Sequence, residues 1–189
     1  AGAVAAINPL MELAITDLGL YKRALHVSGE GEWNWDTDFK SNPAFVPRFG
    51  WGRAILAGQG AVAKGLHIDT PVLTLISTRS DFSRTWNDDM HGSDLVLDVR
   101  RIGAAALHLG DLVTIRRVRG AVHDVMLSRA PVREVIFDEI DRWLDAYVRP
   151  EGAGALYWQR LGRPAAAADP AVPGTPQESD GKGDVAATQ

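Results

Sequence analysis

The spacing of hydrophobic residues alternates between strand-like and helical along the second half of this chain. Two short apolar runs rich in β-branched residues, TPVLTLIST at residues 70–78 and DLVTIRRVRG at 111–120, predict buried strands. Asp98 is placed to cap a helix between them that ends by Gly110, and a longer amphipathic helix is predicted over 130–148. The order strand, helix, strand, helix predicts a parallel pair of strands joined by a crossover.

The first half of the chain is patterned differently. Apolar residues at helical spacing predict a helix over residues 8–25 and a second, loosened by glycine, over 51–68. After the first of these, residues 28–53 have no sustained periodicity but many aromatic residues, which predicts a long irregular segment with packed side chains. The chain thus divides into a helical and aromatic-rich segment (1–66), an α/β part (67–148) and a tail (149–189) that we expect to be disordered.

Two parallel strands alone cannot bury both faces of a sheet, so we expect an α/β fold in which this pair is the last part of a larger sheet. The length of 189 residues suits one domain, and the hydrophobic (46%) and charged (23%) contents are globular. A net charge of −4 argues against a nucleic-acid partner. With no Cys, no apolar run long enough to span a membrane and no basic leader, we expect a cytoplasmic protein without a transmembrane segment.

Candidate chemistry lies in the two loops that leave the predicted strands. Side chains beyond the carboxyl ends of parallel strands gather at one edge of the sheet, where α/β proteins bind ligands. The first loop supplies several acidic residues and the second supplies His123 beside Asp124. An Asp from one loop can orient the imidazole from the other as a general base, and the alternative is a pair of solvated loops.

Four stretches together resemble the C-terminal half of bacterial α/β-hydrolases related to serine aminopeptidases, lysophospholipases and monoacylglycerol lipases. They are GEWNWDTDFK, GWGRAILAGQGAVAKGLHIDTPVLTLIST, SDLVLDV and VRGAVHDVMLSRAPVREVIFDEIDRWL, and the likeness covers about residues 20–145. Such enzymes carry a catalytic triad in the chain order Ser, Asp or Glu, His. The resemblance implies His123 as the base and Asp94 as the acid. Asp81, which follows the strand more closely, is the rival acid, and Asp124 is a third candidate.

The resemblance also implies that the aromatic-rich segment is a lid. Its aromatic side chains would then line a pocket for an acyl or other apolar group, namely Trp33, Trp35, Phe49 and Trp51. Ordinary packing is the alternative role for these side chains. The acidic residues of this segment have no His in register, so we expect neither a metal nor a cofactor.

The chain departs from the family at the nucleophile. No Ser stands in Gly-x-Ser-x-Gly, the turn that presents the attacking hydroxyl in these enzymes. We therefore expect a hydrolase of small-molecule esters or acyl compounds whose nucleophile and oxyanion hole come from a missing N-terminal half or a partner chain. The isolated chain is expected to be inactive. The alternative is a non-catalytic fragment or a binding module for an apolar ligand or a partner.

Overall fold

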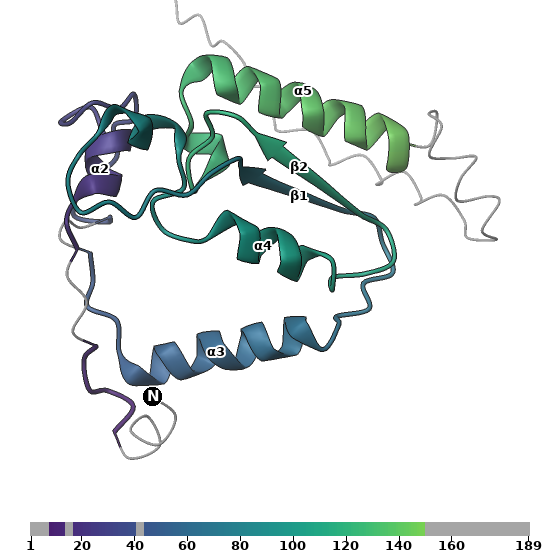
Figure 1. Cartoon of the computed structure of the whole chain (residues 1–189), viewed down its shortest axis with the longest axis horizontal. Helices are drawn as coiled ribbons and strands as arrows, with labels where there is room; N and C mark the ends of the chain where they lie inside the picture. The colour runs from purple at the N-terminus through teal and green to yellow at the C-terminus, as the bar shows by residue number, and fades with distance from the viewer. Residues whose placement is uncertain (1–7, 14–16, 41–43, 150–189) are drawn as a thin grey trace, which may run out of the picture.

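The computed structural model describes residues 8–13, 17–40 and 44–149 of the chain. Within these ranges the elements follow in the order α2 (Leu20–Leu25), α3 (Phe49–Ala63), β1 (Val72–Ser77), η1 (Asp88–Gly92), α4 (Val99–Ala106), β2 (Val113–Val118), η2 (Val125–Leu127) and α5 (Ala130–Tyr147), where η marks a short 3-10 helix. The fold is therefore a mixture of helices and a small sheet (Figure 1).

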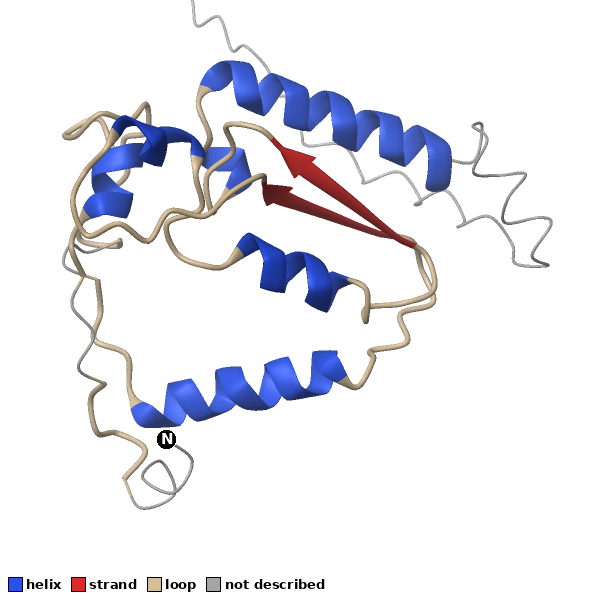
Figure 2. Cartoon of the chain, in the orientation of Figure 1, coloured by secondary structure: helices blue, strands red, loops and turns tan. Residues whose placement is uncertain are grey.

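Strands β1 and β2 form a parallel sheet of two strands in the described part of the chain. Val72 lies opposite Val113 at one end of the register, and Ser77 lies opposite Val118 at the other. Helix α4 connects the two strands, as the crossover of the sequence prediction requires. Figure 2 shows both arrows pointing the same way, so the two loops that follow the strands start at the same edge of the sheet.

Helix α5 covers one face of this sheet. The core there consists of Val118, Ala121 and the fully buried Ile136, with Leu75 of β1 packed against them. The indole Nε1 of Trp143 adds a hydrogen bond to the side-chain oxygen of Thr114 at 3.2 Å. Since the β2 residues on this face alternate along the strand, they and the apolar stripe of α5 bury each other.

Helix α4 packs on the opposite face of the sheet (Figure 1). It begins at the residue that the sequence indicates, because the carboxylate of Asp98 accepts a hydrogen bond from the backbone N–H of Arg100 at 2.9 Å. Gly103 of this helix faces the side chain of Ile76 of β1. The sheet is thus a middle layer between α4 and α5.

The helix predicted over residues 8–25 is wrong for most of its described length. Within the described residues of this stretch only α2 is helical, and Gly19, which precedes it, has φ 68°, a left-handed conformation that a regular α-helix does not contain. Nearer the start, the N–H of Leu13 donates to the carbonyl of Pro47 and the N–H of Phe49 donates to that of Met11. These backbone groups pair with the segment before α3 instead of with one another, which the spacing of apolar residues does not reveal.

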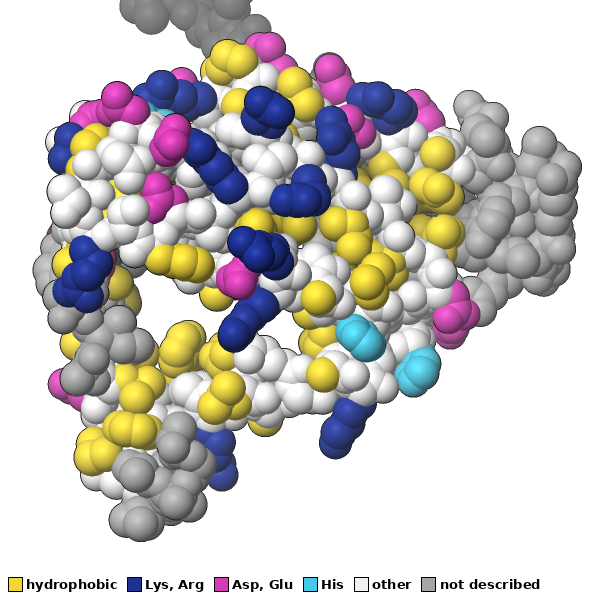
Figure 3. Space-filling view, in the orientation of Figure 1, with side chains coloured by type: hydrophobic (Ala, Val, Ile, Leu, Met, Phe, Trp, Pro, Cys, Tyr) yellow, Lys and Arg dark blue, Asp and Glu magenta, His cyan; other side chains and the backbone are white. Residues whose placement is uncertain are grey.

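Helix α3 begins two residues before the second helix predicted in the first half (51–68) and ends five residues before its predicted end. Among the described residues it packs on little else. None of its residues is buried, and Trp51 (57% exposed), Ile55 and Leu56 face solvent. Figure 3 shows an opening between this helix and the rest of the molecule. Of the tail predicted to be disordered, only Arg149 lies among the described residues. No helix in the described ranges has both the length and the apolar character needed to cross a membrane.

The packing of α5 on the sheet predicts a sharp contrast between neighbouring positions. Ile136→Ala removes methyl groups from a side chain with 0% exposure and should lower the free energy of unfolding by about 2–5 kcal/mol. Phe137→Ala, on the exposed side of the same turn, should change it by about 0.5 kcal/mol or less. Urea denaturation followed by circular dichroism measures both. Equal losses in the two variants would contradict this assignment of the α5 face.

Candidate functional site

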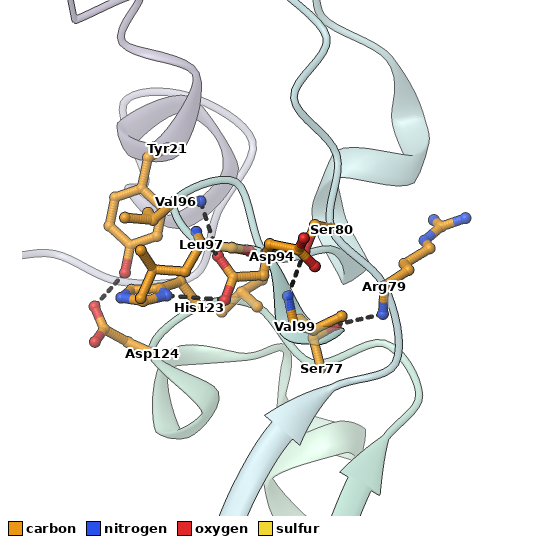
Figure 4. Close-up of polar contacts among 12 residues, drawn as sticks. Tyr21, Ser77, Arg79, Ser80, Asp94, Val96, Leu97, Val99, His123 and Asp124 are labelled. Carbon is orange, nitrogen blue, oxygen red and sulfur yellow. Dashed lines mark hydrogen bonds and ion pairs between the residues drawn. The ribbon is translucent and has the colours of Figure 1, made fainter. Parts of the chain in front are cut away.

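The loops that follow the two strands meet at an Asp–His pair. Asp94 lies in the loop between η1 and α4, and His123 lies in the loop after β2. The ring Nδ1 of His123 donates a hydrogen bond to Oδ2 of Asp94 at 2.9 Å (Figure 4). The structure therefore brings together the two residues that the sequence analysis paired.

Backbone pairing fixes the position of Asp94. Its N–H donates to the carbonyl of Arg79 and its own carbonyl accepts from the N–H of Asp81, both at 3.0 Å. The segment around Asp94 thus runs parallel to the chain just beyond β1. Ser80 and Asp94 form an isolated parallel β-bridge there. This bridge anchors the acidic residue to the end of the strand.

Close backbone contact fixes the second loop. Gly120 has φ 80°, a conformation that suits glycine, and it ends β2 with a turn. A Cβ atom on Gly92 would lie 2.9 Å from the Cα of Gly120, so only glycine lets the two loops approach this closely. Beyond the turn, the N–H of Val122 donates to the hydroxyl of the buried Ser128 at 3.1 Å. His123 therefore projects from a loop that is held at both sides.

The carboxylate of Asp94 is buried but fully provided with hydrogen bonds. The residue is 2% exposed, and its Oδ1 accepts from the N–H groups of Val96 and Leu97, each at 2.8 Å. Burial raises the pKa of Asp94, but the hydrogen bond from His123 and those from the two backbone N–H groups outweigh it, so that the pKa lies below its ordinary value. Asp94 is therefore an anion at neutral pH.

The anion in turn acts on His123. The hydrogen bond to Asp94 raises the pKa of the imidazole, partial burial opposes the shift, and the charges of Asp94 and Asp124 add to it. With Nδ1–H committed to Asp94, the neutral ring carries its lone pair on Nε2. The side chain is 27% exposed, and within the described ranges no hydrogen-bond partner occupies Nε2. This arrangement is that of a general base with one nitrogen oriented by a carboxylate and the other without a hydrogen-bond partner among the described residues.

Tyr21 is the member of the site that sequence reasoning missed. Its ring from α2 meets the ring of His123 edge-on, with centroids 6.4 Å apart, and its hydroxyl donates to the carboxylate of Asp124 (Figure 4). Burial and the Asp124 carboxylate raise the pKa of Tyr21 well above its ordinary value, so the phenol stays a donor. The ammonium of Lys40 lies 3.8 Å from the same carboxylate. No motif marks Tyr21, because its role arises from a contact between distant parts of the chain.

The two other candidate acids serve different partners. Asp81 accepts from the N–H of Ser83 at 2.8 Å and from the amide of Asn87 at 2.9 Å, and these bonds lower its pKa. Its side chain therefore closes a local turn and makes no bond to His123. Asp124 directs its carboxylate to Tyr21 (Figure 4). Of the three candidate acids, Asp94 is the one bonded to the imidazole.

The four aromatic residues assigned to a pocket by the resemblance have other environments. The indole of Trp33 donates to the carbonyl of Leu127 at 2.8 Å, and Trp35 packs edge-on against His26, with centroids 4.6 Å apart. Phe49 and Trp51 belong to the first turn of α3. None of the four lines the apolar cavity that lies beside Tyr21. Trp33 instead ties the aromatic-rich segment to the loop that carries His123.

Comparisons with known proteins provide no family for this chain. No family model, no curated protein and no solved structure matches it. Among the side chains that the structure describes, no group of three His, Cys, Asp or Glu is arranged to hold a metal ion. The chemistry of the site has to be argued from its geometry.

The ion pair predicts how His123 titrates. Asp94→Asn removes the charge that holds the proton, so the pKa of His123 should fall toward about 6.5, the value of an unperturbed imidazole. Because the folded pKa of His123 is raised, the contribution of this histidine to stability is complete below its unfolded pKa and is lost as the pH rises through the folded one. NMR titration of the His123 ring protons measures the shift. Asp81→Asn is the matched control, and an equal fall in that variant would argue against the assignment of Asp94.

Proposed function

We propose that Asp94 and His123 are the acid and base of a serine-type hydrolase of carboxylic esters or related acyl compounds, similar to lysophospholipases. One observation supports this most strongly: a buried carboxylate, with hydrogen bonds to both of its oxygens, accepts a bond from Nδ1 of a histidine whose side chain is partly exposed and whose Nε2 has no hydrogen-bond partner among the described residues. The order of the two residues along the chain also agrees with the α/β-hydrolase resemblance, in which Asp precedes His.

The proposed reaction uses each nitrogen of His123 for a different purpose. Nε2 takes the proton from a serine hydroxyl as that oxygen attacks the ester carbonyl carbon, and Asp94 stabilises the resulting imidazolium. The bond between the carbonyl carbon and the leaving oxygen then breaks, and His123 returns the proton to the leaving alcohol. A water molecule, activated by the same nitrogen, hydrolyses the acyl-enzyme and releases the acid.

The serine residues near this pair are already engaged in the structure. The hydroxyl of Ser93 donates to the carbonyl of Asp89, that of Ser80 donates to the carbonyl of Leu97, and Ser128 holds the loop of His123. We therefore propose that the nucleophile and the oxyanion donors come from an N-terminal half or a partner chain. Among the described elements β1 pairs with β2 alone, so its other edge is open to the strand that such a partner would contribute.

A binding module is the second candidate. It is favoured by the exposed apolar side chains of α3 and by the lack of a Gly-x-Ser-x-Gly turn in the chain. In that case the Asp94–His123 bond would only stabilise the two loops, and replacing either residue would leave any catalysis by an assembled protein unchanged.

Reconstitution separates the two candidates. The 189-residue chain alone should show no p-nitrophenyl butyrate turnover that depends on His123. Together with the polypeptide encoded directly upstream, joined or co-expressed, it should hydrolyse this ester and react with a fluorophosphonate probe. In that assembly Asp94→Asn should lower kcat about 10⁴-fold and His123→Ala about 10⁶-fold, because the residues of a triad act as a unit.

Asp88→Asn is the control, since Asp88 has the same charge and an exposed position in η1, outside both the Asp94–His123 pair and the cavity beside Tyr21. It should keep kcat near that of the wild type. Upstream sequence without Gly-x-Ser-x-Gly, or turnover that survives His123→Ala, would refute the proposed function.

A further inference from the structure

An apolar cavity lies next to the Asp–His pair, between α2, the chain at Ala44 and the loop that follows β1. Its volume is about 450 Å³, within the range of small-molecule sites. Most of its lining is apolar or aromatic and includes Leu18, Leu20, Tyr21, Met90, Leu95 and Val96. Such a lining favours occupants that gain by leaving water.

Two lining residues connect the cavity to the candidate base. Tyr21 lines the cavity and also meets the ring of His123. Val96 lines it and donates its backbone N–H to Asp94. Figure 4 shows both residues beside the Asp94–His123 pair. The cavity and the imidazole of His123 therefore both border on the side chain of Tyr21.

The charged part of the lining is acidic. Asp17 and Asp81 contribute to it, and no Lys or Arg is among the described lining residues. Both carboxylates are held in place: Asp17 accepts from the N–H groups of Gly19 and Ala44, and Asp81 from Ser83 and Asn87. The bonds to Asp81 lower its pKa, so this charge persists at neutral pH. An anionic group brought here is repelled, whereas an uncharged chain is not.

We propose that this cavity binds the uncharged acyl or alkyl chain of the ester substrate. The assignment of the occupant rests on the proposed hydrolase function, because the place beside His123 makes an ester chain the relevant ligand. The apolar lining supplies the affinity, and the two carboxylates discriminate against chains that end in a negative charge. The pocket thus lies between α2 and the loop after β1, and not among the tryptophans of the aromatic-rich segment.

Binding of 1-octanol to the 189-residue protein tests this inference directly. Octanol should produce saturable shifts of the backbone amide of Val96 and the ring protons of Tyr21 in NMR spectra. Octanoate, with the same number of carbons and a negative charge, should bind about tenfold more weakly. Ala44→Trp and Leu18→Trp, which fill the cavity from two sides, should each weaken octanol binding about tenfold.

Ala57→Trp, which adds the same side chain to the exposed α3, should leave octanol binding unchanged. The inference is overturned if octanol gives no saturable shifts, if both filled variants bind it as the wild type does, or if octanoate binds equally well. Failure of the hydrolase proposal looks different, since turnover would then survive His123→Ala while octanol still binds. Conversely, turnover that depends on His123 without octanol binding would remove the cavity assignment alone.

Discussion

The hydrogen bond between Asp94 and His123 depends on the parallel pairing of β1 and β2. Because both strands point the same way, the loops that leave them begin at one edge of the sheet, and residues 29 positions apart come within 2.9 Å. Antiparallel strands would have placed these loops at opposite edges. The close approach of Gly92 and Gly120 then brings the two loops into contact. The hydrogen bond between the two side chains thus depends on both the pairing of the strands and the contact between the loops.

The environment of this bond holds Asp94 and His123 in one arrangement. Asp94 is buried and receives three hydrogen bonds, so its orientation is fixed and its negative charge is retained. Around it, Tyr21 packs on the imidazole from α2 and bonds to Asp124 of the same loop. Supporting contacts of this kind restrict the ring to one orientation. The same tyrosine lines the apolar cavity, so the proposed base and the proposed chain pocket share a wall.

Sequence patterns predicted the α/β part of this chain well. The two strands, α4 with its Asp98 cap and α5 follow from local hydrophobic period and capping chemistry, and the Asp–His pairing follows from the edge that parallel strands share. The stretch before α2 was predicted wrongly, because its backbone pairs with residues near Pro47 that lie far along the chain. The preference for Asp94 over Asp81 came from the resemblance. Its physical reason, the bridge from Ser80 to Asp94, is a contact that no spacing rule reveals.

The role of Tyr21 and the position of the cavity also depend on contacts between residues that are far apart in the sequence. Both arise where α2 packs on loops that lie more than 60 residues away in sequence.

The central claim, that Asp94 fixes the tautomer of His123 and leaves Nε2 as the base, is tested most directly by ¹⁵N NMR of the imidazole above its pKa. The account predicts a protonated Nδ1, with a strongly downfield proton that is lost in Asp94→Asn, and an unprotonated Nε2. A ring protonated at Nε2, or a mixture of tautomers unaffected by Asp94→Asn, would contradict it.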